Sequence, residues 1–441
     1  MTDDLIELLQ ALDAPQLTYR RLDSYFNGDS PLSFLSREAK VALRNFEQIT
    51  SNLCRTAVVS LQERLRLSGM SGAWDLFEYS DLDQLSSDAH RSALLYGWCP
   101  ILCWTDATGK PRATVESPKQ VCVARDPVSR DIVKAAKRVR TKDATLVWVY
   151  YPDRVESWKS NSPSSGNTGF VLVETVPHSL GVCPIVAVGH EDEQSVIADL
   201  LTIQDGINKL LSDMLVASEY AGRPRRFASG IELTQAPKLD AEGNVVTDPD
   251  TGEVVTEPKN PFPESNRMMI SADPASRFGS IPAADLQTFE AGIRVLISQA
   301  MMVSGLPAHY VGLLQDSVTS ADALRAAEAA LVARAEARQR TYGVGWESVG
   351  RLLIAIRDGV DPSSVVARAR WSPADTRSEA QTADAAVKMF QAGILSRTAV
   401  LRRLGLDEDE IREEIHQFHL DAEDAASVTL GRAVTRRAQA A

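Results

Sequence analysis

Histidine and cysteine pairs are the residues of this chain whose spacing could bind a metal. His416 and His419 stand three residues apart, which would place both imidazoles on one face of a helix. Their neighbours are acidic and polar, so a solvated helix face is the better interpretation. Cys99 and Cys103 could form half of a zinc site, but no second pair or nearby histidine completes it. We therefore expect all the cysteines to be reduced, buried thiols: Cys54, Cys99, Cys103, Cys122 and Cys183.

Other patterns that could support chemistry are also incomplete. The segment from Asp248 to Glu253 superficially resembles a calcium loop, yet it lacks the regular acidic spacing and the distal glutamate. A hairpin turn is the better interpretation. His309 lies beside Tyr310 in an expected loop. Packing or hydrogen bonding within the loop is a better interpretation of this histidine than catalysis. The chain contains no HExxH, GxSxG or Walker sequence. The sequence thus predicts a non-enzyme with no catalytic residue, no metal and no cofactor.

Three arginines form a basic cluster. Arg334, Arg338 and Arg340 alternate with Glu328 and Glu336 at helical spacing. This pattern is typical of ion pairs, either within a subunit or between subunits.

Composition limits the classes of function. The 441 residues are enough for two or three domains, and the net charge is −12. A protein that grips DNA phosphates is expected to be basic, so the charge argues against a repressor or an integrase. The negative net charge is compatible with a channel through which DNA slides without being gripped. The opening Met-Thr-Asp-Asp is acidic where a signal peptide needs positive charge, and no uncharged apolar run reaches about 18 residues, so we expect no membrane association.

A helix, a loop and a very long helix form the centre of the predicted structure. The first helix has Ser280 and Pro282 as start signals and ends at Gly305. The second begins near Thr319 and runs to about residue 356, which makes it roughly 55–60 Å long. Gly343 and Gly345 predict a kink in it. The loop between the helices carries a polar tip.

The rest of the chain predicts an α+β protein. Helices are expected at 3–12, 37–67, 75–97, 193–221, 376–393, 396–404 and 407–427. Antiparallel strands joined by hairpins are expected at 98–104, 112–125, 131–139, 145–151, 166–174 and 182–186. The proline-rich segment 223–279 alternates polar turns with short Val-Val strands, which predicts a small β-rich insert between two helices.

Several stretches together resemble the portal proteins (head-to-tail connectors) of tailed bacteriophages, in the siphophage-like group. The most specific are GLPAHYVGLLQDSV from Gly305 to Val318, Ser-Ala-Asp-Ala from Ser320, and a Gln-x-x-Tyr-Gly-x-x-Trp run from Gln339 to Trp346. YFNGDSPLSFL, NLCRTAVVSLQERL, VCPIV and GILSRTAVLRRLGLDEDEIREEI add to the resemblance, which covers nearly the whole chain in order.

The resemblance implies a portal-type subunit, described here in chain order. It has an N-terminal wing at 1–191 with a helical start and a β-rich part at 98–175, a stem helix at 192–222 and a clip at 223–279. The clip is followed by a second stem helix at 280–304 and a tunnel loop at 305–318. The last parts are a long kinked helix with a return to the wing at 319–371, and a helical crown with a tail at 372–441.

The resemblance also implies a function and partners. Such subunits form a dodecameric ring at one capsid vertex, through which double-stranded DNA passes without sequence specificity during packaging and ejection. The implied partners are other copies of the chain, the terminase large subunit, a head-completion adaptor, and the major capsid and scaffolding proteins. The implied location is the virion, with assembly in the host cytoplasm.

Site residues follow from the same resemblance. The tunnel loop that would line the DNA channel contains Leu314, Gln315, Asp316, Ser317 and Val318. The clip residues expected to dock partners are Lys238, Asp240, Glu242, Asn244, Asp248, Asp250 and Glu253. The residues expected in stem packing or between subunits are Ile207, Met214, Phe289, Ile293, Arg334 and Arg338.

Two other classes of function remain open at this point. A metal-dependent nucleic-acid-processing enzyme on a helical scaffold would need converging carboxylates on a sheet, and the sequence assembles none. A capsid scaffolding protein would be a rod with few aromatic residues, against which the seven tryptophans and the β-rich part argue.

Overall fold

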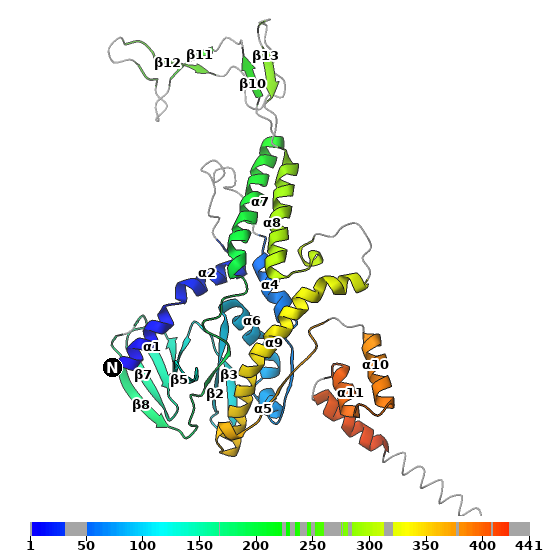
Figure 1. Ribbon diagram of the computed structural model, residues 1–441. Coiled ribbons are helices and arrows are strands. Elements are labelled where there is room, and N and C mark those ends of the chain that lie inside the picture. Colours follow the sequence, from blue (N-terminus) through cyan, green and yellow to red (C-terminus); the bar gives the residue numbers. More distant parts are fainter. Residues whose placement is uncertain are drawn as a thin grey trace, which may run out of the picture. The chain divides into compact units, whose positions relative to one another are not determined.

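The computed structural model describes residues 2–30, 51–166, 168–222, 226–229, 234–238, 245–247, 252–259, 275, 277–280, 285–312, 321–375, 379–406 and 409–422. Contacts divide the chain into two compact units. The first contains residues 1–32, 50–207 and 295–441, and the second contains residues 33–49 and 208–294. The mixed fold of helices and antiparallel sheets confirms the predicted α+β class (Figure 1).

Short helices open the first unit. Helices α1 (Asp3–Asp13), α2 (Gln16–Asn27) and α4 (Leu53–Gln62) precede strand β1 (Leu67–Met70). Helix α1 confirms the helix predicted at 3–12. The long helix predicted from residue 37 lies partly outside the described residues, and its described part ends at Gln62 because β1 follows.

The helix predicted at 75–97 is two helices. These are α5 (Trp74–Tyr79) and α6 (Leu82–Tyr96), separated at Asp81, whose φ of 57° is left-handed. Gly97 ends α6 as predicted, with φ 93°. Only glycine fits there, because a Cβ would lie 2.1 Å from the Glu193 carbonyl oxygen.

The β-rich part contains two sheets of hairpin-connected, antiparallel strands. One has the order β3-β2-β9, built from Pro111–Val115, Trp98–Thr105 and Ile185–Gly189. The other has the order β4-β5-β6-β7-β8, built from Val121–Arg125, Ile132–Arg140, Thr145–Tyr150, Arg154–Ser160 and Val171–Pro177. The single strand predicted at 112–125 was wrong, because a turn at 117–120 divides it between the two sheets.

The five-stranded sheet has apolar layers on both faces. Leucines of α1 pack on one face, against Val147, Val149 and Trp158 (Figure 1). Trp98, Cys183 and Ile185 pack with Ala135 and Tyr150 in a second cluster. All five cysteines are buried and free, as predicted.

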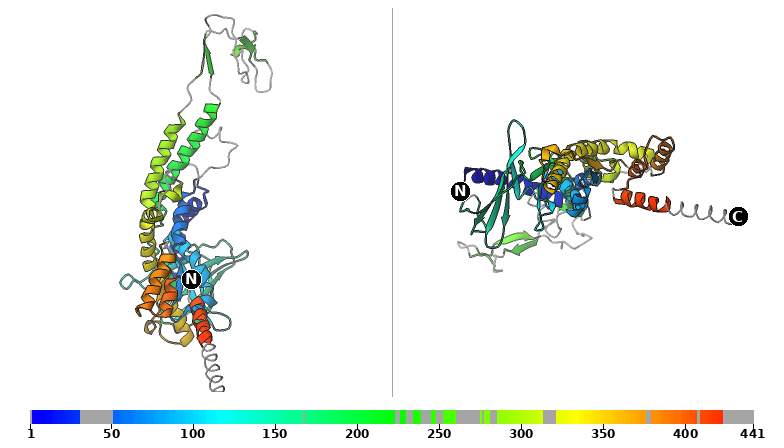
Figure 2. Two further views of the ribbon diagram at one scale, coloured as in Figure 1. Left: turned by 90° about the vertical axis from the view of Figure 1, so that its right-hand side faces the viewer. Right: turned by 90° about the horizontal axis from the view of Figure 1, so that it is seen from below.

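Helices α7 (Leu201–Gly222) and α8 (Leu286–Ser304) run antiparallel and side by side (Figures 1 and 2). Gly206 faces Leu296, and Gly292 faces Leu210, so each helix offers a glycine to a leucine of the other. Added Cβ atoms at these glycines would lie 3.1 and 3.3 Å from the leucine methyl carbons. This close approach explains glycines inside two helices.

Both of these helices begin later than predicted. A short 3-10 helix, Ala198–Leu200, precedes α7. The prediction that Ser280 caps α8 was wrong, since Ser280 pairs with Arg226 in a strand and α8 begins at Leu286. Gly305, with φ 71°, ends α8 as predicted.

Helix α9 (Ala321–Asp358) has 38 residues, which makes it about 57 Å long. It continues unbroken through Gly343 and Gly345, and the kink expected there stays a prediction. Both glycines are buried and allow close packing. A Cβ at Gly345 would lie 2.7 Å from the Ala187 carbonyl oxygen of β9, whereas one at Gly343 would lie 3.4 Å from Trp371 Nε1. After α9, strand β14 (Ala369–Trp371) pairs with β1.

These contacts predict different effects at the two glycines. We expect Gly345→Ala to lower the free energy of unfolding by about 1–3 kcal/mol, because its methyl group meets rigid backbone. Gly343→Ala is the matched control. It meets only a side chain and gains up to about 1 kcal/mol of helix propensity, so it should be neutral or stabilising. Urea unfolding measures both, and equal midpoints for the two variants would contradict the packing role of Gly345.

The second unit contains short antiparallel strand pairs. Strand β10 (Arg226–Ser229) pairs with β13 (Arg277–Ser280), and β11 (Thr234–Pro237) pairs with β12 (Thr256–Lys259). An antiparallel bridge joins Thr247 and Val254. Residues 248–251 between them lie outside the described residues, so the hairpin turn expected there stays a prediction.

The C-terminal part is helical, as predicted. Helices α10 (Glu379–Gln391) and α11 (Arg397–Arg403) are followed by helical residues 409–422. The Ser396 hydroxyl caps α11 by accepting from the Ala399 amide. Within the described residues, no helix combines the length and hydropathy that crossing a membrane requires.

Candidate functional site: the junction of α8 and α9

The expected channel loop lies between α8 and α9. The structure describes the chain up to Gly312 and again from Ala321. Leu314, Gln315, Asp316, Ser317 and Val318 therefore lie outside the described residues, and the site is built from the two helix ends that hold the loop.

The end of α8 is held by α9. The Arg334 guanidinium donates from NH1 to the Val303 carbonyl at 2.7 Å. Its side chain also covers Gly305, where an added Cβ would lie 2.9 Å from Arg334 Nε. Leu306 and Pro307 are buried beyond this turn. The predicted basic residue Arg334 thus fixes the point at which the chain leaves α8.

Glu328 joins the loop base to a distant part of the chain. One carboxylate oxygen lies 3.0 Å from Arg64 NH2, and the other lies 3.3 Å from His309 Nε2. The Arg64 and Glu328 side chains are only 11% and 14% exposed. Arg64 also lies over the Tyr310 ring, 5.8 Å from its centroid. We call Arg64, His309, Tyr310 and Glu328 the loop clamp.

The loop clamp is positioned by three elements. Residues 308–311 form a 3-10 turn, Glu328 lies in the second turn of α9, and Arg64 follows α4. His309 does make the packing and hydrogen-bond contacts that the sequence predicted. The role of Arg64 was missed, because it lies 264 residues from Glu328 and no local spacing connects the two.

The Gln-x-x-Tyr-Gly-x-x-Trp run anchors α9 further along. The Gln339 side-chain amide donates to the carbonyls of Arg64 and Ser372, both at 3.1 Å. Tyr342 and Trp346 are fully buried. Gln339, Tyr342 and Trp346 are spaced so that they lie on one face of α9. This face packs into the core and also forms the hydrogen bond to the backbone of Arg64.

The other expected packing residues have different surroundings. Ile207 is 1% exposed, whereas Met214, Phe289 and Ile293 are half-buried on α7 and α8. Arg338 forms an ion pair with Glu193 of the same chain, and its expected role between subunits stays a prediction.

Only two of the expected clip-docking residues are described. Lys238 lies beside the hairpin, where its amide donates to the Val255 carbonyl at 2.8 Å and its carbonyl accepts from Val246 at 2.9 Å. Glu253 is exposed next to the Thr247–Val254 bridge. Asp240, Glu242, Asn244, Asp248 and Asp250 lie outside the described residues.

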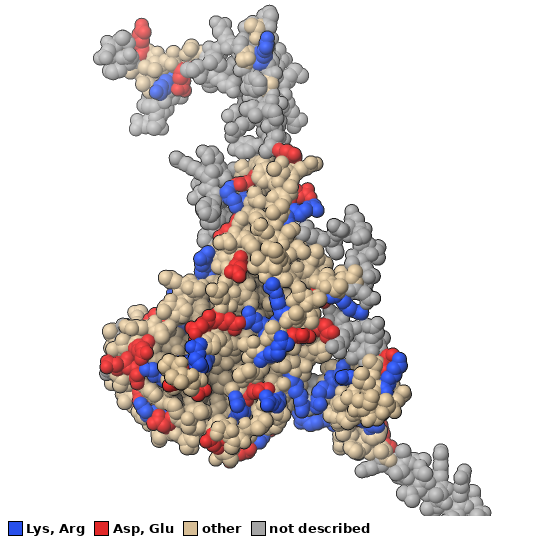
Figure 3. Space-filling view, in the orientation of Figure 1, with Lys and Arg blue, Asp and Glu red and all other residues tan. Residues whose placement is uncertain are grey.

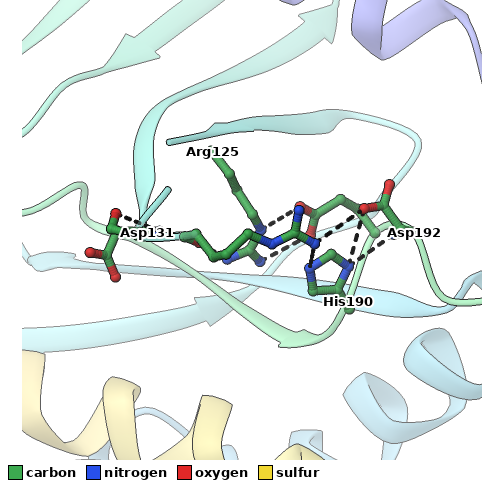
Figure 4. A network of polar contacts seen from close by, with 7 residues as sticks. Arg125, Asp131, His190 and Asp192 are labelled. Carbon is green, nitrogen blue, oxygen red and sulfur yellow. Dashed lines mark hydrogen bonds and ion pairs between the residues drawn. The ribbon is translucent and has the colours of Figure 1, made fainter. Parts of the chain in front are cut away.

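A further polar network, which the sequence did not predict, joins the β4–β5 turn to the segment after β9 (Figure 4). Arg125 forms a bidentate pair with Glu191. Arg130 lies 3.3 Å from His190 Nε2 and 3.7 Å from Asp192. Burial alone would raise the pKa of Glu191, but the hydrogen bond and charge of Arg125 outweigh it and hold that pKa below its usual value. The network fixes a turn of the β-rich part.

The described residues hold no group of three His, Cys, Asp or Glu side chains able to bind a metal. Burial raises the pKa of the Cys54 thiol and that of the Cys122 thiol to about 12. Both thiols therefore stay protonated. At the junction itself, the described side chains make hydrogen bonds and one nearly buried ion pair.

Comparison with known proteins agrees with the sequence resemblance. The family model described as "Phage portal protein, SPP1 Gp6-like" matches residues 47–427. The portal protein of Mycobacterium phage D29 is 25% identical over 347 residues, covering 75% of this chain and 65% of the relative. The portal protein of Mycobacterium phage L5 is 27% identical over 262 residues, covering 57% and 50%. The matched part is thus about half to two thirds of these relatives.

Solved structures were also compared with the fold. A chain from the virion of a native gene transfer agent particle is 13% identical, with a TM-score of 0.44 over 84% of this chain and 94% of that chain. A chain from the neck of the native particle, computed with C12 symmetry, is 15% identical, with a TM-score of 0.41 over 85% and 95%. With a family model that matches more than half of its residues, the chain belongs to the SPP1 Gp6-like phage portal proteins.

Proposed function

We propose that the chain is the subunit of a homo-oligomeric, dodecameric ring at one capsid vertex, through which double-stranded DNA passes during packaging and ejection. The observation that carries the proposal is the α8–α9 junction. There the loop clamp, whose Arg64 and Glu328 side chains have little solvent exposure, joins His309 and Tyr310 at the end of one described stretch to Glu328 in α9. In a ring, one such loop from each subunit would form a collar.

An exposed apolar strip on α8 supports assembly into a ring. Val295 and Met302 are 59% and 74% exposed. They lie seven residues apart on one face, with Ala291, Ser298 and Gln299 between or beside them, so the strip carries no charge. In Figure 3 the surface over α7 and α8 has a central tan strip with charged side chains along its margins. A contiguous uncharged face of this kind suits contact with a second copy.

The chemistry of the loop suits passage rather than grip. No lysine or arginine occurs between Pro307 and Arg325, while Asp316 would repel phosphates. We expect Asp316→Lys to slow DNA movement and to make retention more dependent on salt, because each phosphate that is neutralised releases counterions. A packaging and ejection assay on assembled particles measures this. Asp316→Asn, which removes the charge without adding a cation, should behave like the unchanged protein. Normal packaging and retention by Asp316→Lys would contradict the channel assignment.

We also propose that residues 223–279 form a clip that docks the terminase large subunit during packaging and an adaptor afterwards. Its short strand pairs leave Glu253 and Glu257 exposed, as a partner-docking module needs. Replacing residues 241–257 with a Gly/Ser linker should leave a soluble ring and block packaging or neck assembly. Sedimentation followed by a packaging assay separates these results. Loss of all soluble protein would show instead that the clip is a structural part of the subunit.

The proposed role is structural, in keeping with the family. The chain would conduct DNA while other proteins supply the energy. Background rates in ATPase and nuclease assays with magnesium or manganese would support this, and turnover that is lost in a single Asp or Glu variant would overturn it.

A further inference from the structure

A cavity of about 550 Å³ lies in the first unit, beside the C-terminal end of α9. Its walls come from the end of β2, from the loop after β8, and from the residues where α9 ends. The lining side chains that matter here are Trp104, His178, Leu180, Ile356, Val360 and Asp361. Neither the loop clamp nor the expected clip and tunnel-loop residues contribute to it.

The one charged side chain among the described residues that line the cavity is acidic. Asp361 is the single carboxylate among the described residues that line it, and none of these residues is a lysine or arginine. The Asp361 carboxylate accepts from the Ser363 side chain and from the Ser363 amide, the latter at 2.7 Å, which lowers its pKa and keeps it ionised. Arg357, the nearest basic residue along the helix, is paired with Asp358 at 2.8 and 3.1 Å. The C-terminal end of α9 adds the negative end of a helix dipole.

The remaining walls are aromatic and apolar. Trp104 and His178 pack edge to face, with ring centroids 5.3 Å apart at 86°. His178 Nε2 donates to the Tyr151 carbonyl at 3.0 Å, and Nδ1 accepts from the Leu180 amide at 3.4 Å. These two contacts hold the imidazole ring against the edge of Trp104. Leu180, Ile356 and Val360 supply the aliphatic surface, with Val360 44% exposed.

A carboxylate, an indole ring and an aliphatic wall in one open cavity match a cation carried on an apolar stem. Tryptophan is the best aromatic partner for such a cation, and lysine and arginine pack their methylene groups on apolar surface while the charge reaches a polar partner. We propose that this cavity is a docking pocket for a lysine or arginine side chain of a partner protein, with Asp361 pairing the cation and Trp104 packing against it.

The test uses the full chain and two capped amino acids of nearly equal shape. N-acetyl-arginine amide carries the charge, and N-acetyl-citrulline amide is its neutral isostere. Saturation-transfer NMR, which observes the small molecule and therefore tolerates a large assembly, gives both dissociation constants. We expect the arginine compound to bind about fivefold to tenfold more tightly, as a partly exposed cation site provides.

Variants then assign the binding to the cavity. Asp361→Asn removes the charge but keeps an oxygen that can accept the hydrogen bond from the Ser363 amide. The preference for arginine over citrulline should therefore disappear. Trp104→Leu should weaken arginine binding about fivefold. Asp143→Asn, in the exposed β5–β6 turn, is the matched control and should change nothing. Equal binding of the two compounds, absence of binding, or an arginine preference that survives Asp361→Asn would each overturn the proposal.

Discussion

Trp346→Ala is expected to lower the free energy of unfolding by about 3–5 kcal/mol, which is a large part of the stability of a domain. Trp346 is fully buried on α9, and its indole N–H donates to His90 Nε2 at 2.8 Å. Its ring lies 5.9 Å from that of Phe77 and 5.7 Å from that of His90. Burial lowers the pKa of His90 to about 3, so the imidazole stays neutral and accepts this hydrogen bond throughout the physiological range. Removing the indole leaves both a cavity and an unpaired buried acceptor.

Urea unfolding measures the effect, with Val344→Ala as the matched control. Val344 lies two residues away on the same helix and is 64% exposed, so its truncation should cost less than about 0.5 kcal/mol. Similar losses for the two variants would contradict the view that this face of α9 anchors the core.

Glu328→Ala is the second change with a large expected effect. It leaves Arg64, whose side chain is 11% exposed, without its carboxylate. Breaking a buried pair by removing one partner typically costs about 3–5 kcal/mol, because the remaining charge is buried uncompensated. His309 loses its partner at the same time. We therefore expect lower stability, and easier proteolysis at the loop base between Gly305 and Gly312.

Two comparisons isolate the cause. Glu290 and Arg294 form a pair on α8 with side chains 66% and 64% exposed, and Glu290→Ala should change stability by less than about 1 kcal/mol. The double variant Arg64→Met with Glu328→Met replaces the pair by apolar side chains and should recover much of the loss. A Glu328→Ala variant as stable as Glu290→Ala would show that the clamp does not hold the loop.

Much of the architecture could be predicted because periodicity is local. The long helix from residue 321 to 358, the glycine stops at Gly97 and Gly305, and most of the hairpins follow from spacing and turn residues. Strand β7 was missed because five of the seven residues in its sequence, RVESWKS, are polar. It is a strand because β6 and β8 pair with it on both sides, which is tertiary information.

The candidate site was harder to predict, for the same reason. Spacing suggested ion pairs around Arg334 and Arg338, and the structure gives Arg338 a partner in Glu193. The role of Arg64 could not be predicted from local spacing, because its partner Glu328 lies 264 residues away. The Gln-x-x-Tyr-Gly-x-x-Trp run was recognisable as a motif, and its physical meaning emerged only when Tyr342 and Trp346 proved to be fully buried.

Electron microscopy of the purified chain, stained or frozen, tests directly whether the chain assembles into a ring. We expect ring-shaped particles with a central hole, which mass photometry should place near twelve subunits. Val295→Asp with Met302→Asp, which charges the exposed strip of α8, should dissociate the rings into folded subunits. A chain that stays a compact monomer at all protein and salt concentrations, or a rod without a hole, would contradict assembly into a ring.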